Sequence, residues 1–177
     1  MAQRPYARAR SGAPVRALHG TTRSDADERA RCLAFRAVPA SARAARTFVT
    51  DTLRSWDLEP LTYDAATVVS ELATNAIVHA SDQSDPAAEF HVAVTAGLDQ
   101  VTITVTDLAT DEPAELFPGE PHMGAESGRG LGIVDAYSDD WGWQRQDGAG
   151  KLVWATLAIA RFLPSGGQEE TGADVAR

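Results

Sequence analysis

Residues 62–80, TYDAATVVSELATNAIVHA, form the stretch that decides the fold. Apolar residues recur every three or four positions along it, which predicts one amphipathic helix of about five turns with a wide apolar face. We expect this face to meet the core of the domain. Its members are Leu61, Ala65, Val68, Val69, Leu72, Ala73, Ala76, Ile77 and Ala80.

Two polar residues lie on the edge of that face. Glu71 and Asn75 are one helical turn apart, so a carboxylate and a carboxamide project from one rigid element toward one point. An asparagine oxygen suits a hard cation such as Mg²⁺, and the glutamate offers a base. In an arbitrary sequence, such a pair more often borders a solvated face. The rest of the chain has to decide between the two interpretations.

The composition indicates one globular domain with an acidic body. The 177 residues carry a formal net charge of −9, but residues 1–31 contain seven Arg and only three acidic residues. The acidic body argues against a surface that binds nucleic-acid phosphates, so no direct nucleic-acid partner is expected. The basic leader lacks apolar periodicity, which favours a solvated tail.

Cysteine content and hydropathy exclude further classes. Cys32 is the only cysteine, so neither an intramolecular disulfide nor a cysteine-based metal site can form. No run of about 18 apolar residues predicts a membrane span, and the Arg-rich start lacks the apolar segment of a secretory signal. We expect a cytoplasmic protein without a membrane partner.

The remaining segments predict an α+β sandwich, because the strands are mostly antiparallel and the helices are segregated. Residues 108–127 lack periodicity and are typical of a lid or a binding loop. We expect a disordered leader (1–30), one domain (31–163) and a disordered tail (164–177). The expected strands are 31–38, 90–95, 101–105, 141–144 and 152–159, and a second amphipathic helix covers 41–56.

Residues 128–132, GRGLG, open a third helix. Glycines let a backbone approach a ligand closely, and the N–H groups at a helix start face an anion. Arg129 adds a charge-assisted contact to a phosphate. The stretch is not a Walker loop, since GxxxxGK[ST] is absent, and no strand directly precedes it as in a dinucleotide fingerprint. A short Gly–x–Gly turn alone is a weak signal.

In this order, the motifs resemble the GHKL superfamily of Bergerat-fold ATP-binding proteins, the group of gyrase, histidine kinases and the heat-shock chaperone. The residues that carry the resemblance are ELATNAIVH at 71–79, Asp107 at a strand end, GRGLG at 128–132 and a closing strand with Thr156. The wording SELATNAIVHA and the ending WGW…KLVWATL are similar to anti-sigma factor serine/threonine kinases and their actinobacterial relatives. The resemblance covers residues 33–159. It implies a mixed, mostly antiparallel sheet covered on one face by three helices.

The resemblance also implies a role for each matching residue. Asn75 would ligate the Mg²⁺ that bridges the ATP phosphates, and Glu71 would be the general base acting on a serine of a protein partner. Asp107 would accept the adenine amino group, with Thr156 nearby, and Arg129 would assist at the phosphates. The residues expected to approach the phosphates through backbone N–H groups are Gly128, Gly130, Leu131 and Gly132.

The implied function is transfer of the γ-phosphate of ATP to a serine of an antagonist protein. The implied partners are ATP or ADP, Mg²⁺, the antagonist, a sigma factor and a second copy of the chain. One departure keeps an alternative open: the superfamily motif DxGxG reads Asp107–Leu–Ala–Thr–Asp111 here. The alternative is a non-catalytic module that senses ATP or ADP. A detached histidine-kinase domain is disfavoured, because His19 lies in the leader. For His79, both a structural and a functional role stay open.

Overall fold

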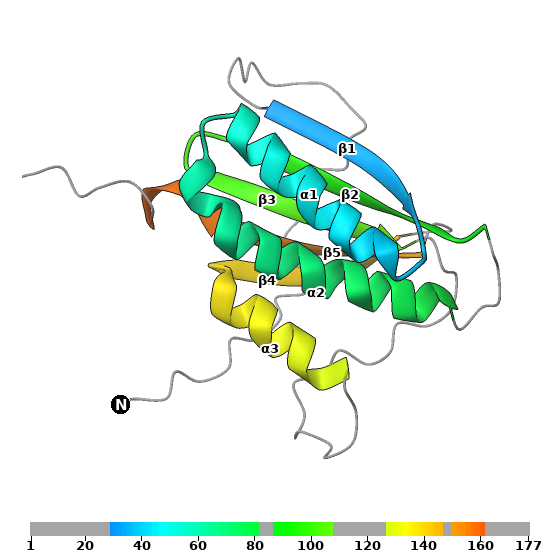
Figure 1. The fold of residues 1–177 in the computed structure, drawn as a ribbon. Coiled ribbons are helices and arrows are strands. Elements are labelled where there is room, and N and C mark those ends of the chain that lie inside the picture. The colour runs from blue at the N-terminus through cyan, green and yellow to red at the C-terminus, as the bar shows by residue number, and fades with distance from the viewer. Residues whose placement is uncertain (1–28, 82–86, 108–126, 147–149, 162–177) are drawn as a thin grey trace, which may run out of the picture.

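An antiparallel sheet carries helices on one face (Figure 1). The structure is a computed structural model that describes residues 29–81, 87–107, 127–146 and 150–161. The strands are β1 (Arg29–Arg36), β2 (Glu89–Ala96), β3 (Gln100–Asp107), β4 (Asp140–Gln146) and β5 (Gly150–Ala158). The helices are α1 (Ala40–Ser55), α2 (Thr62–Ser81) and α3 (Ser127–Tyr137), with short 3-10 turns at Glu59–Leu61 and Ile159–Arg161.

The strand order in the sheet is β1-β2-β3-β5-β4. β4 and β5 pair with each other, and β5 rather than β4 lies next to β3, so β5, the last strand among the described residues, is inside the sheet. The predicted α+β class is confirmed. The expected mixed sheet is corrected in one respect: within the described residues, every pairing is antiparallel.

The central helix forms where its periodicity predicts, over Thr62–Ser81. Its apolar stripe is buried against the sheet and α1, and each fully buried Val or Leu there contributes about 1.5–3 kcal/mol. α2 lies between α1 and α3 (Figure 1). The aromatic rings of Tyr63 and Tyr137 lie 6.1 Å apart, whereas Gly130 faces Glu71, so α3 runs antiparallel to α2.

Alternate residues of β3 face the helices, and this row ends at a candidate site residue. Val101, Ile103 and Val105 are buried on the face that carries the helices, as period-two geometry requires. Asp107 continues the same row and is only 2% exposed. The last residue of β3 therefore brings a carboxylate under the helices, at the end of the apolar core.

Several sequence predictions lie partly or wholly outside the described residues. These are the leader, the irregular segment up to residue 126 and the C-terminal tail. Arg29 and Ala30 already belong to β1, so the predicted leader is two residues too long at this end. GRGLG opens α3, as predicted, and the helix begins one residue earlier, at Ser127. None of the helices in the described ranges has the length and apolarity to span a membrane.

Candidate functional site

A narrow cleft lies between α2, the first turns of α3 and the adjacent ends of β3 and β5. Three of the residues predicted from the sequence meet there: Asn75, Asp107 and Leu131. The full lining is Leu72, Asn75, Ala76, Val105, Asp107, Leu131, Lys151 and Val153. Its free volume is about 10 Å³, the space of about one water molecule. The elements that supply these residues are far apart in the sequence, so only the fold brings them together.

Glu71 and Asn75 face the first turns of α3. A Cβ atom added to Gly130 would lie 2.9 Å from Glu71 Oε2 and 3.7 Å from Asn75 Oδ1. Only glycine lets the α3 backbone approach both side chains so closely. Glu71 and Asn75, the predicted polar edge of α2, therefore face α3 as well as solvent, and both side chains are half-buried.

The buried Asp107 has a cation beside it. Asp107 and Lys151 are cross-strand neighbours on β3 and β5, and Lys151 Nζ lies 3.7 Å from Asp107 Oδ2. The two side chains are 3% and 10% exposed, respectively. Burial lowers the pKa of the Lys151 amine, and the negative charge of Asp107 partly offsets that shift.

Lys151 is the residue that the sequence interpretation missed. The closing strand was expected to begin at residue 152, which left Lys151 between a turn and a strand. The structure begins β5 at Gly150. One signal was available: Lys151 is the only lysine among the 177 residues.

The expected position of Thr156 beside Asp107 is wrong. Thr156 pairs with Thr102, whereas Asp107 pairs with Lys151, five positions away along β5. An odd number of positions puts the two side chains on opposite faces of the sheet. The Thr156 hydroxyl instead donates to the backbone carbonyl of Asp140 at 3.3 Å.

Fewer N–H groups of GRGLG are available to a phosphate than the sequence predicted. A helix leaves only the N–H groups of its first turn without intrahelical partners. α3 begins at Ser127, so the N–H groups of Gly128 and Arg129 belong to that turn. The N–H groups of Leu131 and Gly132 lie further along, where helix geometry directs them to carbonyls four residues earlier. The side chains of Arg129 and His79 lie outside the described residues.

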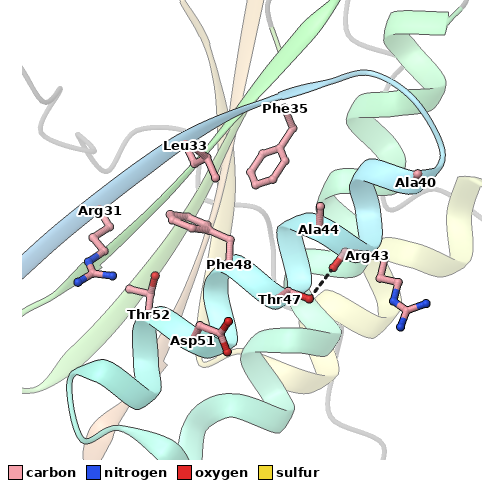
Figure 2. A pocket seen from close by; sticks show the side chains of 10 residues that line it. All are labelled: Arg31, Leu33, Phe35, Ala40, Arg43, Ala44, Thr47, Phe48, Asp51 and Thr52. Carbon is pink, nitrogen blue, oxygen red and sulfur yellow. Dashed lines mark hydrogen bonds between the residues drawn. The ribbon is translucent and has the colours of Figure 1, made fainter.

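A second hollow is larger but contains no predicted site residue. It is a groove of about 570 Å³ between β1 and α1 (Figure 2). Leu33, Phe35 and Phe48 form its apolar part, and the charged residues Arg31, Arg43 and Asp51 lie on it with exposed side chains. The groove therefore offers volume, but its charged side chains are exposed, and the buried polar residue in its lining is Thr52.

A protein-family match includes the residues that form the cleft. The family model described as a histidine kinase-like ATPase domain matches residues 35–157. The match covers most of the chain and includes every residue that lines the cleft. No curated protein matches the chain. The GHKL resemblance is thereby confirmed at the level of the family, and the chain belongs to the histidine kinase-like ATPase domain family.

Proposed function

We propose that this protein is an ATP-dependent serine/threonine protein kinase of the anti-sigma factor type. It binds ATP with Mg²⁺ and transfers the γ-phosphate to a serine of an antagonist protein. The observation that supports this proposal is one continuous polar edge. It runs from the buried Asp107 past Asn75 to Glu71, and the start of α3 lies against its far end.

The cleft end of this edge suits a nucleobase. Asp107 accepts a hydrogen bond from the amino group of adenine, and the apolar walls take the faces of the ring. Those walls are Leu72, Ala76, Val105 and Val153. Asp107 lies buried at the end of the apolar core, so a ligand group that donates to its carboxylate matches this acceptor.

The other end suits phosphates. The first turn of α3 presents N–H groups and the positive end of the helix dipole. No group of three His, Cys, Asp or Glu side chains forms a metal-binding cluster within the described ranges. Mg²⁺ usually keeps several waters and takes few protein ligands beside phosphate oxygens. The Asn75 oxygen therefore fits a metal that arrives with the nucleotide, and the bound ion neutralises phosphate charge.

Glu71 acts on the protein substrate. It accepts the proton of the serine hydroxyl while the serine oxygen forms a bond to the γ-phosphorus. The bond from that phosphorus to the bridging oxygen of ADP breaks, and ADP leaves with the electron pair. Glu71 lies one helical turn from Asn75, which separates the base from the group that contacts the metal.

A second candidate is a nucleotide-sensing module that binds ATP or ADP without transfer. The sequence Asp107–Leu–Ala–Thr–Asp111 favours it, because the two glycines of DxGxG normally let the backbone pass close to the nucleotide. In this candidate, the bound nucleotide changes the surface that a partner recognises, and Glu71 has no chemical role.

The proposed partners extend beyond the nucleotide. They are the antagonist protein, a sigma factor and a second copy of the chain, in the cytoplasm. Light scattering at tens of micromolar protein tests the homodimer, and the mass of a monomer at that concentration contradicts it.

Transfer of radiolabelled phosphate to candidate antagonist proteins tests the kinase proposal. Glu71→Ala should keep ATP affinity and lose transfer by about 10²- to 10⁴-fold, the contribution of a positioned base. Thr74→Ala is a matched control, because Thr74 is exposed on the same helix and its hydroxyl only bonds to the Ser70 carbonyl. If the wild type binds ATP but labels no partner, the sensing module replaces the kinase. If Glu71→Ala abolishes ATP binding, the assigned role of Glu71 is wrong.

A further inference from the structure

The only lysine of the chain lies inside the cleft, where the proposed function has not used it. Lys151 is 8% exposed, and its neighbours in the lining include Val105 and Val153. Its Nζ lies 3.7 Å from Asp107 Oδ2, which is longer than a direct hydrogen bond. An ammonium has three N–H donors, so the contact with Asp107 leaves room for a further acceptor.

The fold alone does not require a charge at this position. Replacing a buried ion pair by apolar side chains of similar volume is often neutral or stabilising, because both charges lose their hydration. The neighbouring positions on the same face of β5, Val153 and Ala155, are apolar and buried. A lysine that instead places an ammonium beside the candidate base-binding carboxylate points to a use in binding.

We propose that Lys151 is a second base-reading residue, whose ammonium donates a hydrogen bond to a ring nitrogen next to the amino group that Asp107 accepts. This inference rests on the proposed nucleotide binding. Adenine carries a donor, its amino group, between two ring acceptors, N1 and N7. A carboxylate and an ammonium side by side present the complementary acceptor and donor.

The size of the cleft makes the role of Lys151 testable. Its free volume of about 10 Å³ does not hold a purine, so the lining has to move when a base binds. Lys151 has the most rotatable bonds of the lining residues. Either its ammonium turns toward the ring, as proposed, or its side chain occupies the space that the base needs and has to be displaced. The two outcomes change ATP affinity in opposite directions.

A double-mutant cycle between protein and ligand distinguishes these outcomes. The protein change is Lys151→Met, and the ligand changes are ATP analogues in which N1 or N7 is replaced by C–H. The wild type should bind one of the two analogues about tenfold more weakly than ATP, a typical loss for a hydrogen bond to a charged group. Lys151→Met should bind ATP about tenfold more weakly, and it should bind that analogue no worse than ATP. Arg54→Met is the matched control, because Arg54 is an exposed cation on α1.

A measurement on the unmodified protein covers the case in which Lys151→Met does not fold. Protein produced with ¹³C-labelled lysine carries a single labelled residue, so its spectrum reports Lys151 alone. Its side-chain signal should shift when ATP binds. The shift should be smaller with the analogue that lacks the contacted nitrogen.

The possible results separate the role of Lys151 from the proposed kinase activity. Equal affinities for ATP and both analogues in the wild type overturn it, and so does tighter ATP binding by Lys151→Met. ATP binding without phosphate transfer overturns only the kinase proposal and leaves the role of Lys151 intact. A wild type that binds no ATP overturns both.

Discussion

The cleft and the groove show that the larger cavity is not the one that gathers buried charged groups. The groove between β1 and α1 has a volume of about 570 Å³, but its charged residues, such as Arg43 and Asp51, are exposed. The cleft has room for only about one water molecule, yet it gathers Asn75, Asp107 and Lys151 from three elements. Convergent, desolvated polar groups indicate a ligand site better than size does.

The energetic reason is desolvation. Arg54 Nη1 lies 3.1 Å from Asp51 Oδ1 on the surface of α1. Such exposed ion pairs contribute about 0–1 kcal/mol to stability, because water screens them. Asp107 and Lys151 are almost completely removed from water. Charges in such a place interact strongly with any polar group that enters, because little water screens them.

The largest expected effect on nucleotide affinity comes from Asn75→Ala. In the proposed assignment the Asn75 oxygen would ligate Mg²⁺, so the variant should lose Mg²⁺-dependent ATP affinity on the order of 10²-fold. Without Mg²⁺, variant and wild type should bind ATP equally. Calorimetric titrations in both conditions measure this, with Thr47→Ala in the groove as the control. Equal loss in both variants would remove the distinction between cleft and groove.

A smaller effect is expected from Asp107→Asn. The carboxamide replaces a pure acceptor by a group that can also present a donor to the adenine amino group, so affinity should fall about tenfold. Circular dichroism has to show an intact fold, because the change also takes the carboxylate away from Lys151. Unchanged ATP affinity in a folded variant contradicts the assigned adenine pocket.

Two of the three glycines of α3, Gly130 and Gly132, test the packing against α2 at the level of single atoms. A Cβ at Gly132 would meet nothing within 4 Å, so Gly132→Ala should stabilise the protein by about 1 kcal/mol through helix propensity. A Cβ at Gly130 would lie 2.9 Å from Glu71 Oε2, so Gly130→Ala should gain less, since the carboxylate has to move. Urea denaturation of both variants tests this. Equal stabilisation would mean that α3 does not press on Glu71.

The pH dependence of Lys151 is the smallest expected effect. Burial lowers the pKa of its amine below the ordinary 10.5, so the unfolded chain binds more protons in the window between the lowered value and 10.5. The free energy of unfolding should therefore rise with pH through that window as far as Lys151 contributes. The ¹³C signal of the labelled lysine gives the midpoint directly. A midpoint at or above 10.5 contradicts the buried position.

Much of the site was predictable, because α2 has a strong helical period. That period places Glu71 and Asn75 one turn apart on the edge of the buried face, and the structure confirms the helix. Asp107 was predictable as the last residue of an alternating strand. In both cases, the local pattern of apolar residues determines which side a polar group takes.

Strand register was not predictable in the same way. Whether Lys151 or Thr156 faces Asp107 depends on how β5 pairs with β3, and a shift by one residue reverses every side chain. The start of α3 also depends on its packing against α2, because a run with three glycines has little helix propensity of its own. The groove forms from two separate elements, β1 and α1, so no single stretch indicates it.

An amide NMR titration with ATP and Mg²⁺ tests directly whether the nucleotide binds in the cleft. The largest shift changes should cluster at the cleft, on the amides around Asp107, Gly130 and Lys151 and on the Asn75 side chain. Signals from the groove, such as those of Phe48 and Thr47, should stay in place. Shift changes concentrated in the groove, with the cleft signals unmoved, would contradict nucleotide binding in the cleft.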